Sequence, residues 1–529
     1  KYMLRNRFGN KKEDWCKTHD FKLESIKLTK SISTSKILID QKFSFLNLSK
    51  EFQQEIDWNY NEYGKLWTYN LNYFDWLQQK DLKINIGLKS IKDYIEYLDN
   101  LKDGLEPFPI SLRLLNWMKF VTLNDINDPK INDAIINQAN RLENNIEYHL
   151  LGNHLFANAK ALLFAGCYFK GELADVWLKR GLGILNEEIP EQILADGGNF
   201  ELTPMYHNTI LADMLDLYQL SLVYPTKIPK ATSQGWRELI GKMLSWAEQM
   251  QHPDGDVSFF NDSAMGIAPK LAVLQRYAEA IGINFPTINK NQVNHLKESG
   301  YVVVQDDVNK LLIDVAKVGP DYIPGHAHAD TLSFELSLHN QRLIVNGGTS
   351  VYGTETERHR QRGTRAHSTL NINLADSSEV WGGFRVGRRA KVSDINYNVT
   401  AESLTASANH RGYVHLHGRP VHQRSWKLEE QKLTVTDHIG GQLSQQFEIN
   451  FHLAPYIEVI ADRDNEIQLF DRNGKKIIHA RTSHPAGFQI IPGSWHPKFG
   501  VSVKNQCIRI SADGVAPLSV KTIFEWSDC

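Results

Sequence analysis

The hydrophobic periodicity of this chain changes near Ile283, and this change constrains the fold more than any other feature. Before Ile283, apolar residues recur three and four positions apart, as in the stretch 208–222, and this spacing is typical of amphipathic helices. From Gly300 onward, short strand-like segments follow one another between turn signals. Many helices followed by many strands predict two segregated domains, one all-α and one all-β.

The same periodicity predicts where the individual elements lie. We expect helices at residues 73–79, 88–101, 110–121, 131–169, 173–189, 207–223, 233–251 and 269–282. We expect strands at residues 301–305, 310–316, 331–338, 342–346, 369–374, 421–428, 432–438 and 446–453, which together predict a β-sandwich of large antiparallel sheets. The predicted domains are an N-terminal extension at 1–60, extended at 27–36, a helical domain at 61–290 and a sandwich at 295–529.

Composition limits the kinds of partner. Of the 529 residues, 42% are hydrophobic and 23% charged, which is typical of a soluble globular protein. A net charge of −2 gives no reason to expect nucleic acid, and no apolar run is long enough to span a bilayer. The four cysteines are scattered and do not suggest a disulfide framework. The chain opens at Lys1 without a signal-like apolar segment, so the sequence leaves compartment open, and it leaves the oligomeric state open as well.

Two histidines, His326 and His328, lie two residues apart in the segment Pro-Gly-His-Ala-His-Ala-Asp at 324–330. The next residues alternate between apolar and polar, which predicts a half-buried strand, so we expect both side chains to enter that strand on the same face. Two imidazoles on one face can hold a metal, a general base, or one of each. The alternative is a pair of ordinary surface or satisfied histidines.

Two further motifs combine a glycine with residues capable of chemistry. Gly152 and Asn153 break one helical pattern, so Asn153 lies at a helix N-terminus. There it either caps the helix or presents its amide to an anion beside the positive end of the helix dipole.

A Gly-rich turn at 196–199 leads to Tyr206 and His207. This pair either caps and packs, or supplies a tyrosine hydroxyl whose pKa is lowered by neighbouring positive charge and which acts as base or acid.

A cluster of basic residues follows the strand that ends in Asn346-Gly-Gly-Thr-Ser-Val-Tyr at 346–352. Four arginines and two histidines lie between 358 and 369. The cluster is either a solvated charge run or a binding site for a polyanionic ligand.

Taken in order, these motifs resemble those of the heparinase II/III-like polysaccharide lyases, with the resemblance covering roughly residues 67–453. Its markers are Ser-Leu-Arg-Leu-Leu-Asn-Trp at 111–117, Gly-Asn-His-Leu at 152–155, Gly-Asn-Phe-Glu-Leu-Thr-Pro-Met-Tyr-His at 198–207, Pro-Asp-Gly-Asp at 253–256, Gly-His-Ala-His-Ala-Asp at 325–330 and Arg-Ala-His-Ser-Thr-Leu at 365–370. The resemblance implies an α+β multidomain fold, in which an N-terminal α/α toroid, an incomplete barrel of helical hairpins, precedes a C-terminal antiparallel β-sandwich.

The resemblance also implies a reaction, the β-elimination that cleaves an acidic polysaccharide at C4 of a uronic acid. The C5 proton is hard to remove because the adjacent carboxylate is a poor electron sink until hydrogen bonds or charge neutralise it. The resemblance assigns this neutralisation to Asn153, and the acid and base roles to Tyr206 and His326, with no cofactor needed for the elimination itself. Residues expected to bind the substrate are His154, Glu201, His207, Tyr352, Arg358, Arg362 and Arg365.

A structural divalent metal, zinc or calcium, is a further implication of the resemblance. Its ligands in the family are the second histidine of the His-x-His motif, an aspartate that ends the next strand, and a later histidine. The matching residues here are His328, Asn346 and His367. Asn346 departs from the pattern, and since an amide oxygen is a weaker, uncharged ligand than a carboxylate, the departure counts against zinc.

The expected substrate is a heparan-sulfate-like glycosaminoglycan first and a bacterial exopolysaccharide next. Such lyases favour a periplasmic or secreted location over the cytoplasm. One alternative is a glycoside hydrolase on the same scaffold, for which Glu201 with Asp196 or Glu335 would supply the two carboxylic acids. The other is a non-catalytic protein for glycan binding or assembly, because a shared fold does not guarantee activity.

Overall fold

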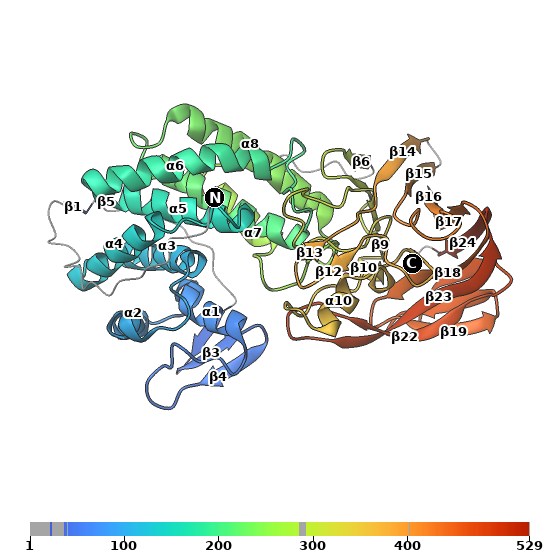
Figure 1. The fold of residues 1–529 in the computed structure, drawn as a ribbon, viewed down its shortest axis with the longest axis horizontal. Helices are drawn as coiled ribbons and strands as arrows, with labels where there is room; N and C mark the ends of the chain where they lie inside the picture. Colours follow the sequence, from blue (N-terminus) through green and yellow to red (C-terminus); the bar gives the residue numbers. More distant parts are fainter. Residues whose placement is uncertain (1–21, 24–35, 40, 285–291, 401–402, 528–529) are drawn as a thin grey trace. The chain divides into compact units, whose positions relative to one another are not determined.

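The computed structural model describes residues 22–23, 36–39, 41–284, 292–400 and 403–527 (Figure 1). The chain divides into two compact units. The first comprises Lys1–Phe45, Lys50–Glu188 and Leu220–Pro229, and the second comprises Leu46–Ser49, Ile189–Gln219 and Lys230–Cys529. Apart from Lys36, the extended segment predicted at 27–36 lies outside the described residues. No helix in the described part of the chain is both long and apolar enough to cross a membrane.

Helices fill the chain from residue 65 to residue 280, largely where the periodicity predicts them. They are α1 (Lys65–Tyr73), α2 (Ile84–Tyr97), α3 (Pro107–Leu123), α4 (Pro129–Glu143), α5 (Gly152–Tyr168), α6 (Glu172–Gln192), α7 (Pro204–Val223), α8 (Lys230–Met250) and α9 (Leu271–Ala280). The prediction of one helix at 131–169 is wrong, because Leu151 and Gly152 adopt positive φ values of 58° and 54° between α4 and α5. Residues 73–79 form the end of α1 and a short 3₁₀ turn, Asp75–Gln78.

Glycines let α5 and α6 approach closely within the first unit. A Cβ atom on Gly166 of α5 would lie 2.5 Å from the backbone nitrogen of Leu178 in α6. In the reverse direction, a Cβ atom on Gly181 would lie 2.6 Å from the carbonyl oxygen of Ala159. Since real Cβ atoms do not come this near to backbone atoms, the contact requires glycine on both helices.

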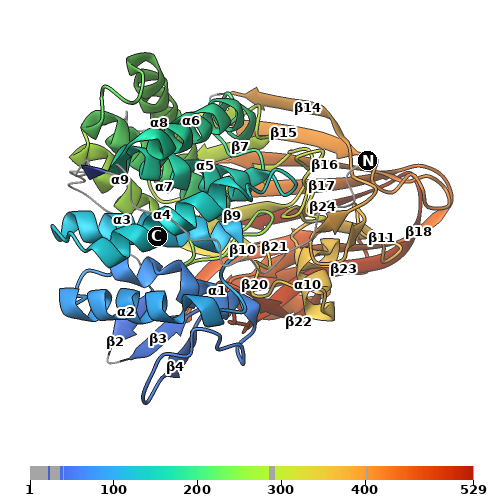
Figure 2. The same ribbon diagram turned by 60° about the vertical axis from the view of Figure 1, so that its left-hand side comes forward.

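Two large antiparallel sheets form the C-terminal half. The nine-stranded sheet has the order β22-β23-β18-β10-β9-β8-β7-β6, with β11 also paired to β18, and the eight-stranded sheet has the order β14-β15-β16-β17-β24-β21-β20-β19. Figure 2 shows β14, β15, β16, β17 and β24 side by side in this order. The bounds in the nine-stranded sheet are β6 (Gln292–Leu296), β7 (Tyr301–Gln305), β8 (Lys310–Asp314), β9 (Phe334–Leu338), β10 (Gln341–Val345), β11 (Leu370–Ile372), β18 (Ser444–Leu453), β22 (Gln489–Trp495) and β23 (Val503–Val515). Those in the eight-stranded sheet are β14 (Val392–Val399), β15 (Ser403–His410), β16 (Val421–Glu429), β17 (Lys432–Gly440), β19 (Glu458–Arg463), β20 (Glu466–Phe470), β21 (Lys476–Thr482) and β24 (Leu518–Glu525).

Smaller elements complete the chain. The hairpin of β12 (Val380–Trp381) and β13 (Arg385–Val386) lies beside the short helix α10 (Thr356–Arg362) in Figure 1. The remaining pieces are β1 (Lys22–Leu23), β2 (Ile37–Ile39), β3 (Lys42–Phe45), β4 (Leu48–Glu51), β5 (Phe169–Lys170) and the 3₁₀ turns Leu98–Asn100 and Thr364–Ala366.

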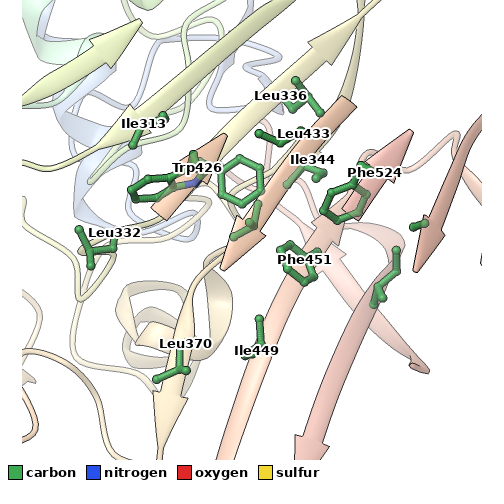
Figure 3. Packing of buried hydrophobic residues seen from close by; sticks show 14 of the residues in the cluster. Ile313, Leu332, Leu336, Ile344, Leu370, Trp426, Leu433, Ile449, Phe451 and Phe524 are labelled. Carbon is green, nitrogen blue, oxygen red and sulfur yellow. The ribbon is translucent and has the colours of Figure 1, made fainter. Parts of the chain in front are cut away.

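The main hydrophobic core lies between the two large sheets. Figure 3 shows Trp426 and Leu433 of the eight-stranded sheet packed among side chains of the nine-stranded sheet such as Ile344 and Phe451. Alternate residues of β15, β16 and β17 are buried, as expected for strands with one face on a core. The structure is therefore the predicted sandwich.

The strand predicted at 331–338 is present but shorter, and the prediction that it is half-buried is wrong. Strand β9 begins only at Phe334, and all five of its residues are buried. A second hydrophobic cluster explains this burial, because Trp246 and Met250 of α8 cover the outer face of the nine-stranded sheet at Val303 and Leu312. The polar residues of β9 face this covered side, where His252 bonds to the Glu335 carboxylate at 2.8 Å and to the Ser337 hydroxyl at 2.7 Å.

Candidate active site

His326 and His328 lie in a turn-rich loop before β9 and not in a strand, so period two does not set the direction of their side chains. Both rings nevertheless reach one carboxylate, that of Asp262. The distances are 2.9 Å from His326 Nδ1 to Asp262 Oδ2 and 2.8 Å from His328 Nε2 to Asp262 Oδ1. The backbone N–H of Asp262 also donates to the carbonyl of His326 at 3.0 Å, so two loops distant in sequence are joined at this point.

Asp262 is fully buried and paired with a buried arginine. Both terminal nitrogens of Arg358 bond to its carboxylate, and the Thr349 hydroxyl donates to it at 3.2 Å. Burial alone would raise the pKa of Asp262, but Arg358 and the two histidines hold that pKa well below its usual range. Asp262 is therefore an anion at neutral pH. No motif in the sequence points to Asp262, which is a polar residue that follows two phenylalanines, Phe259 and Phe260, closely.

The Asp262 carboxylate determines which ring nitrogen of His326 carries a proton. Because an ionised carboxylate only accepts hydrogen bonds, Nδ1 of His326 donates in this contact, so in the neutral form of the ring the lone pair is on Nε2. The side chain of His326 is 15% exposed. An imidazole oriented in this way is suited to act as a general base through Nε2.

Tyr206 and Tyr352 meet beside His326. Their hydroxyl oxygens are 2.9 Å apart, and the Tyr206 ring centroid lies 4.2 Å from that of His326. Burial raises the pKa of both tyrosines above the ordinary value, so the lowered pKa considered for Tyr206 is wrong. Two protonated hydroxyls that share one hydrogen bond leave one O–H free to donate elsewhere.

The facing imidazoles of His328 and His367 cannot form a hydrogen bond with each other while both rings are neutral. His328 Nε2 faces the Asp262 carboxylate, and His367 Nδ1 faces the carbonyl of Gly363 at 2.9 Å, so each ring needs its proton there. Burial lowers the pKa of His328 to about 4 and that of His367 to about 3, so neither ring holds a second proton at neutral pH. His328 Nδ1 and His367 Nε2 then direct two lone pairs at each other across 3.1 Å.

A second histidine pair in the same protein shows the contrast. His410 Nε2 and His422 Nδ1 are also 3.1 Å apart, but the N–H of Gly412 donates to His410 Nδ1 and His422 Nε2 faces the Asp437 carboxylate. With both rings neutral, every contact in this chain pairs one hydrogen-bond donor with one acceptor. The His328–His367 pair is different because only a cation or an extra proton would resolve it, and a metal bound by two imidazoles fits that requirement.

Asn346, the third predicted ligand, is buried and partly engaged. Its amide oxygen accepts from the backbone N–H of Ser368 at 3.0 Å, and its amide nitrogen donates to the Ser333 hydroxyl at 3.2 Å. A carbonyl oxygen has two lone pairs, so one remains for a metal. The donor types at these three residues, two imidazole nitrogens and one neutral oxygen, therefore suit a cation.

The structure separates the four clustered arginines. Arg358 and Arg362 are buried on one face of α10, where Arg362 donates to the carbonyls of Ala327, Gly382, Gly383 and Arg385. Arg360 pairs with Glu357 on the other face, and Arg365 pairs with Glu448. The four arginines therefore do not form a single basic surface for a polyanionic ligand. The guanidinium groups of Arg358 and Arg362 bind other groups inside the protein.

Other predicted residues of the second unit lie in the interior. His207 is buried, bonds to the carbonyl of Met243 at 3.0 Å and packs on Trp246, and burial lowers its pKa to about 3. Glu201 is buried as well. Of the hydrolase candidates, Glu335 is saturated by His252 and by backbone N–H groups, and the Asp196 carboxylate accepts from Ser299. These contacts give the carboxylates of Glu335 and Asp196 structural roles.

Asn153 and His154 belong to the first unit, in the first turn of α5. Leu151 takes the N-cap position, so the alternative that Asn153 caps the helix is wrong. His154 stacks on Phe108 with ring centroids 4.3 Å apart, and its Nδ1 lies 3.3 Å from the Glu147 carboxylate. The Asn153 side chain is partly exposed in the turn where the helix dipole is positive.

Models of one protein family match most of the chain. The model described as Heparinase II/III N-terminus matches residues 111–291, and the model described as Heparinase II/III-like, C-terminal, matches residues 289–527. The chain is similar to a heparin-sulfate lyase of Bacteroides stercoris, 25% identical over 357 residues that cover 59% of this chain and 50% of that protein. It is also similar to a heparin-sulfate lyase of Pedobacter heparinus, 27% identical over 341 residues that cover 59% of this chain and 48% of that protein. The chain thus spans about half the length of these curated relatives.

Solved structures show the same fold. The crystal structure of heparinase III superposes with a TM-score of 0.70 and 18% sequence identity, over 90% of this chain and 80% of that chain. The predicted fold class, an α/α toroid followed by an antiparallel β-sandwich, is confirmed by this likeness.

Proposed function

Because the chain belongs to the heparinase II/III-like family, we propose that it cleaves a uronic-acid-containing polysaccharide by β-elimination. The observation that carries the proposal is the meeting of an oriented imidazole, His326, with the hydroxyl pair of Tyr206 and Tyr352. Such a site offers a base and an acid side by side, which is what elimination needs and what hydrolysis by two carboxylic acids does not use.

The proposed catalytic roles follow from which groups in the site can accept a proton and which can donate one. His326 Nε2 removes the C5 proton of the uronate, and the electron pair released forms the C4–C5 double bond as the C4–O bond breaks. The hydroxyl pair, through Tyr206, donates its free proton to the leaving oxygen, and burial, which raises the pKa of Tyr206, keeps this proton in place at neutral pH. Asp262 holds the imidazolium that forms on His326, while Arg358 keeps Asp262 ionised. The resemblance gives Asn153 the task of neutralising the uronate carboxylate.

A heparan-sulfate-like glycosaminoglycan is the first proposed substrate, because the curated relatives are named heparin-sulfate lyases. A bacterial exopolysaccharide that contains uronic acid is the second. Both occur outside the cytoplasm, which supports a periplasmic or secreted location.

We also propose that His328, His367 and Asn346 hold a structural divalent cation. When bound, it would supply positive charge between the two facing lone pairs and so fix His328 against Asp262. Two imidazole ligands favour zinc over calcium, which prefers oxygen. The elimination itself uses only His326 and the two tyrosines.

Ultraviolet absorbance tests the reaction, because elimination creates a conjugated unsaturated uronate. The parent protein and the Tyr206→Phe and His326→Ala variants are incubated with heparan sulfate, heparin, hyaluronan, chondroitin sulfate and alginate. We expect absorbance to rise with at least one polysaccharide for the parent, and to stay flat for both variants. New reducing ends without absorbance would indicate a hydrolase, and no cleavage of any polysaccharide would favour a glycan-binding protein.

A further inference from the structure

Two buried arginines hold one turn of the chain in place. The turn joins β12 to β13, and its carbonyls at Gly382, Gly383 and Arg385 accept from Arg362, while Gly383 also accepts from Arg358 at 3.1 Å. Arg362 donates as well to the carbonyl of Ala327, between His326 and His328. The same guanidinium therefore ties the turn to the histidine loop.

Close packing adds to this attachment. A Cβ atom on Gly383 would lie 2.2 Å from the carbonyl oxygen of Gly353, the residue after Tyr352, so the turn presses directly against the tyrosine segment. His359 of α10 contacts the carbonyl of Gly382 at 3.1 Å. The residue carried on this turn, Phe384, consequently has a fixed position.

Phe384 is an exposed aromatic ring beside the acid and base groups. Its ring centroid lies 5.9 Å from that of His326 and 5.2 Å from that of Tyr352, and the Arg358 guanidinium lies 5.4 Å from it. Despite these contacts the residue remains 41% exposed. On the same hairpin, Trp381 is 55% exposed, and it pairs with Arg385 across the two strands.

Exposed aromatic residues on a rigid turn suit a ligand with an apolar face. A pyranose ring has such a face, formed by its C–H groups, and hydroxyl and carboxylate groups around its edge. Aromatic rings bury a large area with little loss of conformational freedom, and exposed apolar patches mark interaction sites. The polar groups of a sugar that lies on Phe384 would then point toward His326 and the tyrosines.

We propose that Phe384 and Trp381 form a stacking surface for the pyranose rings of the polysaccharide. This inference deepens the proposed function and rests on it for the identity of the substrate. It also explains why Arg358 and Arg362 are buried, since both hold the turn that presents these rings instead of meeting the polyanion themselves.

Variants of the two aromatic residues test the stacking surface by kinetics. We expect Phe384→Ala and Trp381→Ala to raise KM about tenfold with little change in kcat, because stacking contributes to binding. Phe384→Tyr, which keeps the ring, should raise KM less than Phe384→Ala does. Tyr397→Ala is the matched control, because Tyr397 is an aromatic residue of similar exposure, 44%, on β14 of the eight-stranded sheet. Parent-like KM values for both alanine variants would overturn the inference.

Affinity electrophoresis separates this inference from the proposed reaction. The same substitutions are made in a Tyr206→Phe background and run in gels that contain heparan sulfate, hyaluronan or neutral dextran. We expect an acidic polysaccharide to retard the background protein, and Phe384→Ala and Trp381→Ala to reduce that retardation. Retardation that both alanine variants reduce, without any elimination by the parent, would refute the reaction and keep the stacking surface. Unchanged retardation in both variants, or none in the background protein, would refute the stacking surface.

Discussion

At the scale of single residues, the site depends on the carboxylate of Asp262. This group bonds to two histidines and one arginine, and each contact has a different consequence. It fixes the proton on His326, it holds His328 beside His367, and it offsets the buried charge of Arg358. No local pattern in the sequence indicates these roles, because the partners lie 64, 66 and 96 residues away along the chain.

The Asp262→Asn substitution tests the first of these contacts. An amide that donates to His326 Nδ1 forces the proton to Nε2, so the base loses its lone pair. We expect kcat to fall by about three to four orders of magnitude while KM changes little. The measurement is the initial rate of ultraviolet absorbance on the best polysaccharide.

Asp254→Asn is the control for this experiment. Asp254 forms a similar two-point ion pair with Arg342, at 2.7 and 3.1 Å, but has no contact with His326 among the described residues. This variant should lose stability and keep its kcat. A parent-like kcat in Asp262→Asn, or an equal loss in both variants, would contradict the positioning role.

The two histidine pairs predict where a metal binds. We expect the parent protein, after dialysis against zinc, to retain the metal stoichiometrically, and His367→Gln to lose it. His422→Gln should retain it, because the His410–His422 pair needs no cation. Elemental analysis by mass spectrometry of the folded fractions gives the answer. Equal zinc in His367→Gln and in the parent would exclude this pair as the site.

At the scale of elements, hydrophobic periodicity predicted most helices and strands. It failed where contacts between distant parts of the chain determine the local backbone conformation or burial. Strand β7 lies where the sequence predicts it, at Tyr301–Gln305. His326 and His328 were predicted to enter a strand because the residues after them alternate, but contacts to Asp262 and a positive φ of 62° at Leu332 keep this segment irregular. The burial of β9 could not be predicted, since α8 covers its second face from a distant part of the chain.

The helix contact at Gly166 supports a stability prediction at this scale. Gly166→Val would force side-chain atoms into the backbone of α6, so we expect the free energy of unfolding to fall by about 1–3 kcal/mol. Gly183→Ala is the comparison, because Gly183 of α6 has open space around its Cβ position. This change should stabilise the protein by about 0.5–1 kcal/mol, since alanine favours a helix more than glycine does. Urea denaturation followed by circular dichroism measures both, and a Gly166→Val midpoint at or above that of the parent would refute the close contact.

At the scale of the whole molecule, the order of the motifs predicted the fold class, and the types of the residues predicted part of the site. Tyr206 and His326 were expected together and lie together. The arginine cluster was expected at a surface because a sequence does not distinguish a charge that is buried and paired from one that is exposed. Phe384 carries no motif, and its place beside His326 arises from the folding of the hairpin onto α10.

The central claim is that the chain breaks a polysaccharide by elimination, and the isotope content of the products tests it most directly. The protein is incubated with heparan sulfate in water enriched in the heavy oxygen isotope, and the oligosaccharides are analysed by mass spectrometry. Elimination adds no water across the bond, so we predict unsaturated products without the heavy isotope at the new chain ends, and none of these products for Tyr206→Phe. Heavy oxygen at the new reducing ends of saturated products would show hydrolysis and would contradict the account.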